Sequence, residues 1–472
     1  MKKPLSGIIF SSLFLLAAII LGNSCNKIPR DDSAVTTPTI VTFSLISNVT
    51  QTGALSGGVV TNTGGSVLSN GVCWSSTNAL PTINDSKTVD SVGTPTGFKS
   101  TVTGLTGGTT YYLRAYASNA DGTGYGAVIK FTTLTTPGIL TATVTTLAGS
   151  TTGAYGYTDN IGNSALFNGP QYVSYNANDG KLYVSDVLNN AIRTIVPATG
   201  QVASYTQPTL GFTNGPLSSA SFYGPAGIVF DTQNNTYVAD LGNNAIRQIS
   251  AAGTVTTFAG NGLYNYYDAT GTAAYFASPQ GLAIDASNNI YVADRANNLI
   301  RKITPAGVVS TVAGGIASTG TSQQTVPGYA DGSTGPTSLF NRPTSVALDQ
   351  KGGLFVADVN NRAVRDVNLS TGATITIAGN TVQTALLGAP TAVASDATGN
   401  LYVVDQAGRI LEITTNNVLY VLAGSSTAGF KDGVGTGALF NTPTGIAVDA
   451  NGVVYVADFG NNCIRKLVVK VQ

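Results

Sequence analysis

Short, largely apolar segments separated by polar turns recur along the second half of the chain. Each is rich in Val, Ile, Tyr and Thr and is bounded by Gly, Pro, Asn or Asp, a pattern typical of β-strands. Four segments form a unit, as in Pro279–Asp285, the two runs within Ile290–Ile303, and Val308–Gly314. The turn residues between them tolerate special backbone angles or bond their own backbone. Each unit is therefore predicted to be a sheet of four antiparallel strands.

The second strand of the unit ends in an aspartate that marks each copy of the repeat. The six copies are marked by Asp186, Asp240, Asp294, Asp358, Asp405 and Asp458. A period of about 50 residues is typical of solenoids and propellers. A lone four-stranded sheet cannot bury both faces, whereas similar sheets arranged radially can. The pattern thus favours an all-β ring of sheets.

The motifs within one unit also carry a family resemblance. Pro443–Arg465 contains P-x-G-I-A-V-D, then Y-V-A-D and N-N-x-I-R, and resembles NHL repeats. The resemblance covers residues 142–472 and implies a six-bladed β-propeller. Val144–Gly149 matches the fourth strands Val255–Gly260 and Val418–Gly424, and the last unit has no fourth strand of its own. We therefore predict that 144–149 joins the last blade and closes the ring.

The first 24 residues predict a signal peptide. Lys2 and Lys3 precede an apolar stretch that is short for a membrane span. Leu21–Cys25 resembles a bacterial lipobox, although its leucine is one position further from the cysteine than usual, and this implies lipidation of Cys25. The alternative is plain cleavage near Ser24, which would give a soluble secreted protein. Residues 25–38 are predicted to be a polar linker.

Residues 39–134 are predicted to form a second, smaller domain. Thr101–Asn119 resembles the late strands of a fibronectin type III module, with Tyr111 where that family places its tyrosine corner. Trp74 is expected to fill the core of this sandwich. The resemblance implies a spacer that holds the propeller away from the membrane. Residues 135–141 are predicted to be a second linker.

The charge balance and the cysteine content argue against nucleic-acid binding and against disulfides within a domain. The chain has 23 basic and 23 acidic residues and no basic run, which argues against nucleic-acid binding. The cysteines are Cys25, Cys73 and Cys463. If Cys25 is lipidated, one cysteine remains in each domain, so a disulfide within a domain is impossible. Cys463 takes a position that alanine or leucine holds in other units, so it is expected to be a small buried hydrophobe.

Candidate catalytic chemistry is sparse. The chain has no histidine, which removes Ser-His-Asp and Cys-His nucleophile systems and the commonest zinc ligand. Glu412 is the only glutamate. We therefore predict no catalytic residue, no metal ligand and no cofactor. The alternative is a propeller enzyme, similar to lyases or lactonases, that uses aspartate and a metal.

The repeat aspartates are followed seven residues later by arginines in five units. These arginines are Arg193, Arg247, Arg301, Arg365 and Arg465. A structural Asp–Arg bridge across the hairpin is the favoured interpretation, and a ring of charge around the channel mouth is the alternative. A site used only once should break the repeat, so departures from it are the better guide to function.

The departures gather in the loops from fourth to first strand and from second to third strand, which should share one face. Leu263–Tyr267 carries extra tyrosines, Gly315–Ser338 is a long insertion, and Asn380–Gly388 is short enough to leave a notch. Aromatic faces stack on sugar rings while amides and guanidiniums bond hydroxyls. The predicted ligand site comprises Tyr264, Tyr266, Tyr267, Gln280, Arg295 and Arg342.

These observations favour a non-catalytic lipoprotein of the cell envelope. It would be anchored in the outer membrane, on the surface or periplasmic side, through its lipid alone, or otherwise be secreted. Its propeller is predicted to bind a glycan, peptide or protein at the loop face. A purely architectural role is a third possibility.

Overall fold

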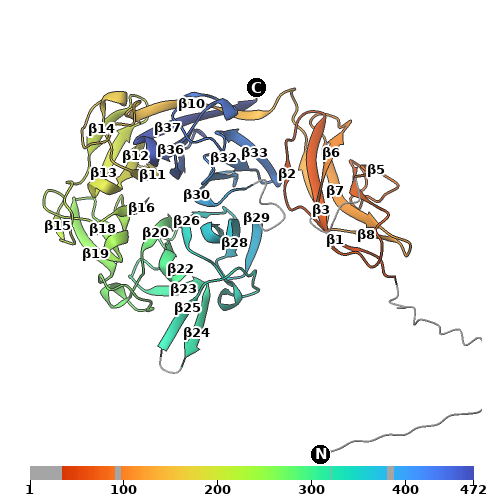
Figure 1. Cartoon of the computed structure of the whole chain (residues 1–472). Coiled ribbons are helices and arrows are strands. Elements are labelled where there is room, and N and C mark those ends of the chain that lie inside the picture. Colours follow the sequence, from red (N-terminus) through yellow and green to blue (C-terminus); the bar gives the residue numbers. More distant parts are fainter. Residues whose placement is uncertain (1–34, 91–96, 320–321, 380–386, 472) are drawn as a thin grey trace, which may run out of the picture. The chain divides into compact units, whose positions relative to one another are not determined.

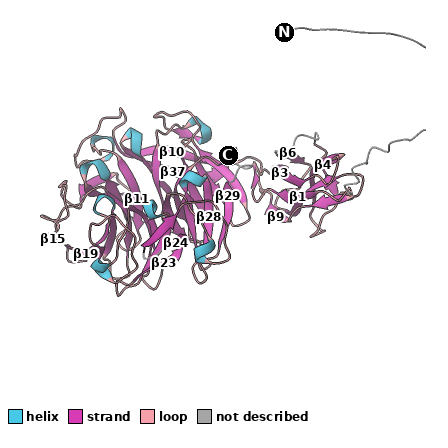
Figure 2. Ribbon diagram, turned by 60° about the horizontal axis from the view of Figure 1, so that its bottom comes forward, coloured by secondary structure: helices cyan, strands magenta, loops and turns pink. Residues whose placement is uncertain are grey.

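The computed structural model describes residues 35–90, 97–319, 322–379 and 387–471 (Figure 1). Strands and short 3-10 helices make up the regular structure of these residues, and the helices lie near the ends of the strands (Figure 2). The predicted signal peptide, Cys25 and most of the first linker lie outside the described residues. No helix in the described part of the chain is long and apolar enough to cross a membrane.

Six antiparallel sheets lie between Leu140 and Val471, each with four strands in the predicted order. The first strands are β11 (Pro170–Asn176), β16 (Pro225–Phe230), β20 (Pro279–Ile284), β26 (Pro343–Leu348), β30 (Pro390–Ser395) and β35 (Pro443–Val448). The second strands are β12 (Lys181–Asp186), β17 (Thr236–Asp240), β21 (Ile290–Asp294), β27 (Gly353–Asp358), β31 (Leu401–Asp405) and β36 (Val454–Asp458). The third strands are β13 (Ala191–Val196), β18 (Ala245–Ile249), β22 (Leu299–Ile303), β28 (Ala363–Asn368), β32 (Ile410–Ile413) and β37 (Cys463–Val471). The fourth strands are β14 (Gln201–Ser204), β19 (Thr254–Gly260), β23 (Val309–Ala313), β29 (Thr374–Gly379), β33 (Val418–Ala423) and β10 (Leu140–Gly149).

The first strands form a closed ring around a central axis (Figure 1). Each contacts the first strands of its two neighbours, in the order β11, β16, β20, β26, β30, β35 and back to β11. Asparagine side chains join neighbouring sheets. Asn190 Oδ1, for example, accepts a hydrogen bond from Gly224 N, and Asn462 Oδ1 accepts one from Gly169 N, which ties the last sheet to the first.

The ring is closed as predicted, by the strand that precedes the first unit. β10 pairs with β37 in antiparallel register, with Val144 opposite Leu467. The strand is longer than expected, because Leu140 and Thr141 already pair with Val471 and Lys470. The linker predicted at 135–141 therefore ends two residues early.

The residues before Leu140 form two further groups of strands. One contains β1 (Thr39–Thr42), β3 (Gly53–Asn62) and β6 (Phe98–Thr103), and the other β4 (Ser69–Ser75), β5 (Ser86–Lys87), β7 (Thr110–Ser118), β8 (Thr123–Tyr125) and β9 (Ile129–Thr132). Tyr111 accepts a hydrogen bond from Thr106 N on its hydroxyl at 3.0 Å. Trp74 is only half-buried, although it packs against the core as expected. Cys73 and Cys463 are both buried and free of disulfides.

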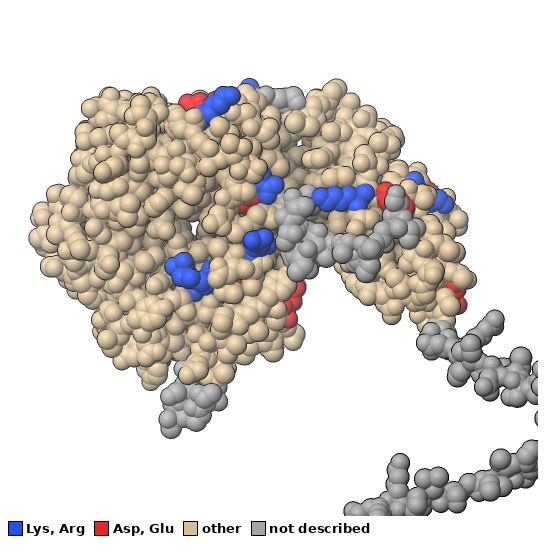
Figure 3. All heavy atoms as spheres, in the orientation of Figure 1, with Lys and Arg blue, Asp and Glu red and all other residues tan. Residues whose placement is uncertain are grey.

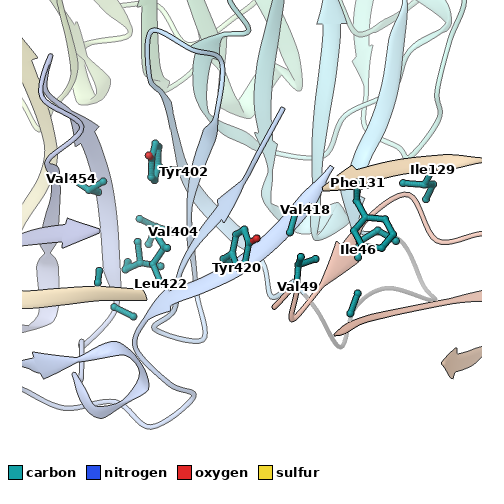
Figure 4. Close-up of a cluster of buried hydrophobic side chains, with 14 of the residues drawn as sticks. Ile46, Val49, Ile129, Phe131, Tyr402, Val404, Val418, Tyr420, Leu422 and Val454 are labelled. Atoms are coloured by element: carbon teal, nitrogen blue, oxygen red, sulfur yellow. The ribbon is translucent and has the colours of Figure 1, made fainter. Parts of the chain in front are cut away.

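Short segments cover the outer edges of the sheets. β15 (Gly215–Pro216) pairs with β19 and β34 (Gly433–Val434) with β10; both segments precede the first strand of their own sheet. In the fifth sheet a segment from the N-terminal region takes this position. β2 (Ile46–Ser47) pairs in parallel with Val418 and Leu419 of β33. Figure 4 shows Ile46 and Val49 close to Val418 in the buried cluster that results.

The loops hold the remaining elements. Four 3-10 helices precede first strands: η1 (Gly162–Ser164), η4 (Gly271–Ala273), η6 (Gly335–Thr337) and η8 (Gly435–Gly437). Five join second to third strands: η2 (Val187–Asn189), η3 (Leu241–Asn243), η5 (Arg295–Asn297), η7 (Val359–Asn361) and η9 (Phe459–Asn461). The insertion predicted after the third unit contains a hairpin, β24 (Gly315–Thr319) and β25 (Ser322–Val326).

Candidate functional site

The repeat arginines are structural, as the favoured interpretation predicted. In the third unit Arg301 Nη1 donates to Asp294 Oδ2 at 2.7 Å, and both side chains are fully buried. Its guanidinium lies between the rings of Tyr266 and Phe276, at 4.8 and 5.1 Å. The same Asp–Arg pair recurs in four other units, at Arg193, Arg247, Arg365 and Arg465. Fully buried and paired, these arginines are not available to a ligand.

Burial also sets the proton affinity of the repeat aspartates. It raises the pKa of Asp186, Asp240 and Asp358 to about 6, while the hydrogen bonds that each accepts and the arginine partner lower it. The carboxylates therefore stay largely ionised at neutral pH and keep their arginine partners.

One predicted site residue has a repeat role instead. Tyr266 was expected to be an extra tyrosine, but its ring covers Arg301 in the same way that Phe212 covers Arg247 and Phe430 covers Arg465. The expectation failed because spacing alone did not show which tyrosine of Leu263–Tyr267 held the repeat position. Tyr267 packs against Tyr275, with ring centroids 5.8 Å apart. Tyr264 is the most exposed of the three, at 65%.

A single tyrosine crosses the central axis near the loop face. Tyr172 lies at the start of β11 in the first sheet, yet its hydroxyl donates to the carbonyl of Thr344 on β26 in the fourth, at 2.5 Å. The residue is buried. The equivalent positions of the other units hold small residues: Gly227, Gly281, Ser345, Ala392 and Gly445. Tyr172 therefore fills space that the other first strands leave open.

Gln280 and Arg295 lie beside Tyr172. Burial raises the pKa of Tyr172, and the Arg295 charge and a hydrogen bond with Gln280 lower it in part. Gln280 is 8% exposed and its Oε1 has no hydrogen-bond partner within the described structure. Arg295 Nε is likewise buried without a partner there. Buried polar atoms are normally paired, so Gln280 Oε1 calls for an explanation. An unpaired buried Nε is less informative, because Arg193, Arg247, Arg365 and Arg465 have one too.

Arg342 adds a second guanidinium to this group. Its charge lowers the pKa of Arg295, after the effect of burial, while Tyr172 and Tyr264 act in the opposite direction. Arg342 N donates to Asn298 Oδ1 at 2.8 Å, which fixes its backbone at the boundary between the third and fourth sheets. Neither Arg295 nor Arg342 forms an ion pair with any described acidic residue, in contrast to Arg301.

We call Tyr264, Gln280, Arg295 and Arg342, together with Tyr172, the rim site. The first four were predicted from the sequence. The backbone of Arg342 bonds Asn298, three residues after Arg295, and the charges of Arg342 and Tyr264 act on the pKa of Arg295. Tyr172 was missed, although it breaks the P-x-G motif of the first strand and that break was a usable signal. Figure 3 shows separate basic patches near the centre of the face in view, with acidic atoms beside only some of them.

A hollow lies at the other end of the axis. It has a volume of about 410 Å³ and is lined by the later halves of all six first strands, including Val173, Ile228, Leu282, Val346, Val393 and Ile446. Because its walls are mainly aliphatic side chains and backbone, it offers no group of convergent charges. In the described residues no cluster of three or more Cys, Asp or Glu side chains could hold a metal ion.

The units match a known family of repeats. Residues 276–303 and 440–467 match the family described as NHL repeat. Two curated proteins are related in sequence. Protein SUPPRESSOR OF QUENCHING 1, chloroplastic, of Arabidopsis thaliana is 28% identical over 285 residues, 54% of this chain, and Teneurin-3 of Danio rerio is 27% identical over 342 residues, 64% of this chain. The chain spans only 26% and 11% of these relatives.

Solved structures show the same fold over nearly the whole chain. An auxiliary nutrient binding protein from Bacteroides thetaiotaomicron is 14% identical, with a TM-score of 0.51, 93% of this chain covered and 99% of the other. A protein of unknown function from the same species is 17% identical, with a TM-score of 0.51 and coverages of 92% and 98%. With the repeat matches, these similarities support an NHL propeller within an all-β chain.

Proposed function

We propose that the protein is a non-catalytic binding protein of the cell envelope whose rim site holds a glycan. The observation that carries this proposal is the pair Arg295 and Arg342. Arg342 N bonds Asn298, three residues after Arg295; burial and then the charge of Arg342 lower the pKa of Arg295; and neither arginine has an ion-pair partner among the described acidic residues. Like charges brought together without compensation are unfavourable, and a bound ligand would relieve that repulsion.

The contrast with the repeat arginines supports a ligand rather than a structural role. Each repeat arginine has an aspartate, backbone carbonyls and two aromatic rings, as Arg301 does. The fold thus gives each of these guanidiniums an anionic partner, although Nε of Arg193, Arg247, Arg365 and Arg465 stays buried and unpaired. Arg295 has no anionic partner among the described residues, and the buried Oε1 of Gln280 has no hydrogen-bond partner there. Ligand pockets typically offer a few convergent polar groups of this kind beside aromatic surface.

The proposed architecture assigns the six sheets to the blades of a six-bladed NHL propeller. Residues 39–134 are then a fibronectin type III-like module, supported by the pairing of β4 with β7 and by the hydrogen bond to Tyr111. We further propose a lipoprotein signal in residues 1–24, lipidation of Cys25, and outer-membrane anchorage through that lipid. A binding role is consistent with the fold that this chain shares with the Bacteroides auxiliary nutrient binding protein.

A glycan array with the purified protein tests the proposal. We expect binding to at least one glycan, and we expect its loss in the double variant Arg295→Leu/Arg342→Gly. Elemental analysis of the same sample addresses the alternative of a metal-dependent lyase or lactonase. A stoichiometric metal, together with an activity that chelation abolishes, would overturn the non-catalytic assignment.

A further inference from the structure

We infer that a cavity beside the fifth sheet binds a small aromatic carboxylic acid, with Arg409 as its anchor. The cavity has a volume of about 890 Å³, within the usual range of small-molecule sites. It is lined by β33, by the loop from β31 to β32 and by short segments around Val49 and Leu140. None of its described lining residues belongs to the rim site, so this is a second site, beyond the proposed function.

The five regular units, all except the fifth, show what occupies the equivalent space. In the sixth unit Asn461 donates to the carbonyl of Gly429 at 2.9 Å. The next residue, Phe430, places its ring centroid 4.9 Å from the guanidinium carbon of Arg465. Asp432 then accepts a hydrogen bond from Arg465 at 2.6 Å. An aromatic ring and a carboxylate from the segment before the first strand therefore bind one guanidinium together.

The fifth unit keeps a guanidinium but lacks the segment that would cover it. Residues 380–386, which lie outside the described residues, include no aromatic and no acidic residue. Arg409 bonds Oδ2 of Asp405 through Nε at 2.9 Å and through Nη2. Within the described residues it has neither the aromatic ring nor the second acid that Arg465 has. A ligand that brings a ring and a carboxylate would restore both contacts.

The walls of the cavity are more apolar than the equivalent surface of a regular unit. Val421 takes the position of Thr311, whose hydroxyl donates to Asp268 in the third unit. Val49 and Tyr420 also line the cavity and belong to one buried cluster (Figure 4). The hydroxyls of a sugar would lose their hydration against such walls without gaining partners. The cavity therefore favours an apolar ring with a single charged group over a glycan.

The edge of the fourth strand favours a small molecule over a partner peptide. In the second sheet the covering segment β15 pairs with this edge at Val255. In the fifth sheet β2 already pairs with the equivalent part of the edge, Val418 and Leu419. A peptide therefore has no strand edge to add to at this position, whereas a small acid needs only the cavity. The ligand class is an aromatic ring joined to a carboxylate through a short chain.

Two substitutions test the site, and a third serves as their control. Arg409→Lys keeps a cation beside Asp405 but loses the planar face and the fork, so we expect binding to weaken about tenfold or more. Ser426→Trp places a large side chain at an exposed position of the cavity wall and should abolish binding without lowering the melting temperature. Thr151→Trp changes the same exposed position after β10 in the sixth sheet and should leave affinity unchanged.

Calorimetry with four probes measures these effects on the full chain. The probes are phenylpropionate, phenylpropanol, cyclohexylpropionate and the end-blocked peptide Gly-Phe-Lys-Asp, which copies the segment of the sixth unit. We expect phenylpropionate to bind most tightly and to lose affinity in Arg409→Lys and Ser426→Trp. Equal binding of the alcohol or of the cyclohexyl acid would overturn the assigned class, and so would tighter binding of the peptide. Absence of phenylpropionate binding, or binding that Ser426→Trp leaves unchanged, would overturn the site itself. Glycan binding at the rim site is unaffected by any of these results.

Discussion

The fifth sheet lacks the buried arginine and the aromatic rings that the other five share, so it shows which contacts of the repeat are dispensable. In the five regular units a buried arginine is held by an aspartate and two aromatic rings, as Arg301 is by Asp294, Tyr266 and Phe276. In the fifth unit Asp405 pairs with Arg409, four residues away and 20% exposed at its side chain. The third strand there carries Glu412 in place of the neutral or basic residue of most other units.

This difference shows how the edge of a sheet can be covered by two unrelated segments. In regular units the segment before the first strand wraps over the fourth strand, and its acid, or Asn214 in the second unit, bonds the buried arginine, as Asp432 bonds Arg465. The fifth sheet is instead covered by β2, which pairs with β33 at the positions that β15 covers on β19. An unpaired edge invites association with other chains, so some cover is needed in every unit.

The largest expected effect comes from removing the buried arginine of a regular unit. Arg301→Met leaves Asp294 buried without a counter-charge, and removal of one partner of a buried pair costs about 3–5 kcal/mol. Denaturant unfolding followed by fluorescence measures the loss. The matched change in the fifth sheet is Arg409→Met, which also leaves a fully buried aspartate, Asp405, without its ion-pair partner. Because Arg409 is 20% exposed, water can partly replace it, and we expect a smaller loss of about 2–3 kcal/mol. Equal losses in the two variants would contradict the distinction between regular and fifth units.

The fifth sheet should show a pH dependence of its own. Glu412 is 5% exposed, its Oε2 lacks a partner within the described structure, and burial, with a smaller effect of Asp396, raises its pKa to about 7. Tyr402 and Tyr420 lie opposite it on the neighbouring strands. Because the folded state holds the proton more tightly than the unfolded state, stability falls as pH rises from the ordinary glutamate value to about 7.

Glu412→Gln isolates this effect, since Gln248 already occupies the equivalent position of the second unit. The difference in unfolding free energy between variant and parent should grow by up to about 3 kcal/mol between pH 4.5 and pH 8, in favour of the variant. The other buried carboxylates contribute equally to both proteins and cancel. A difference that stays flat with pH would show that Glu412 titrates normally.

A substitution in β2, which covers the edge of the fifth sheet, should have a smaller effect on stability. Ile46 is fully buried in the cluster shown in Figure 4, opposite Val418. Ile46→Val removes one methylene and should cost about 0.5–1.5 kcal/mol. Amide exchange should speed up at β33 more than at β19, whose edge is covered by β15. Uniform faster exchange at both strands would argue against a local role for β2.

The sheets, their strand order and the closing strand could be predicted from the sequence because the same strand pattern recurs in six units. For the proposed rim site, the sequence pointed to Tyr264, Arg295 and Arg342 because each departs from the repeat, whereas Gln280 has a counterpart in Gln171 of the first unit. Tyr172 was missed although it breaks the motif too, since its partner Thr344 lies 172 residues away across the axis. No sequence pattern predicted the role of β2, because a two-residue strand has no periodicity and its partner strand belongs to a distant unit.

The smallest expected effect concerns Tyr266. It was predicted to contact the ligand, but its ring packs on the repeat arginine Arg301. Phe212 and Phe430 hold its position over the arginine in two other units, so the ring is needed there and the hydroxyl is not. Tyr266→Phe should change the unfolding free energy by less than about 0.5 kcal/mol and leave glycan affinity unchanged, in the range of a substitution away from special features. Tyr264→Phe, which keeps a stacking ring at the rim, is the matched control. A marked loss of affinity in Tyr266→Phe alone would place its hydroxyl against the ligand and extend the rim site to a residue that the fold also uses.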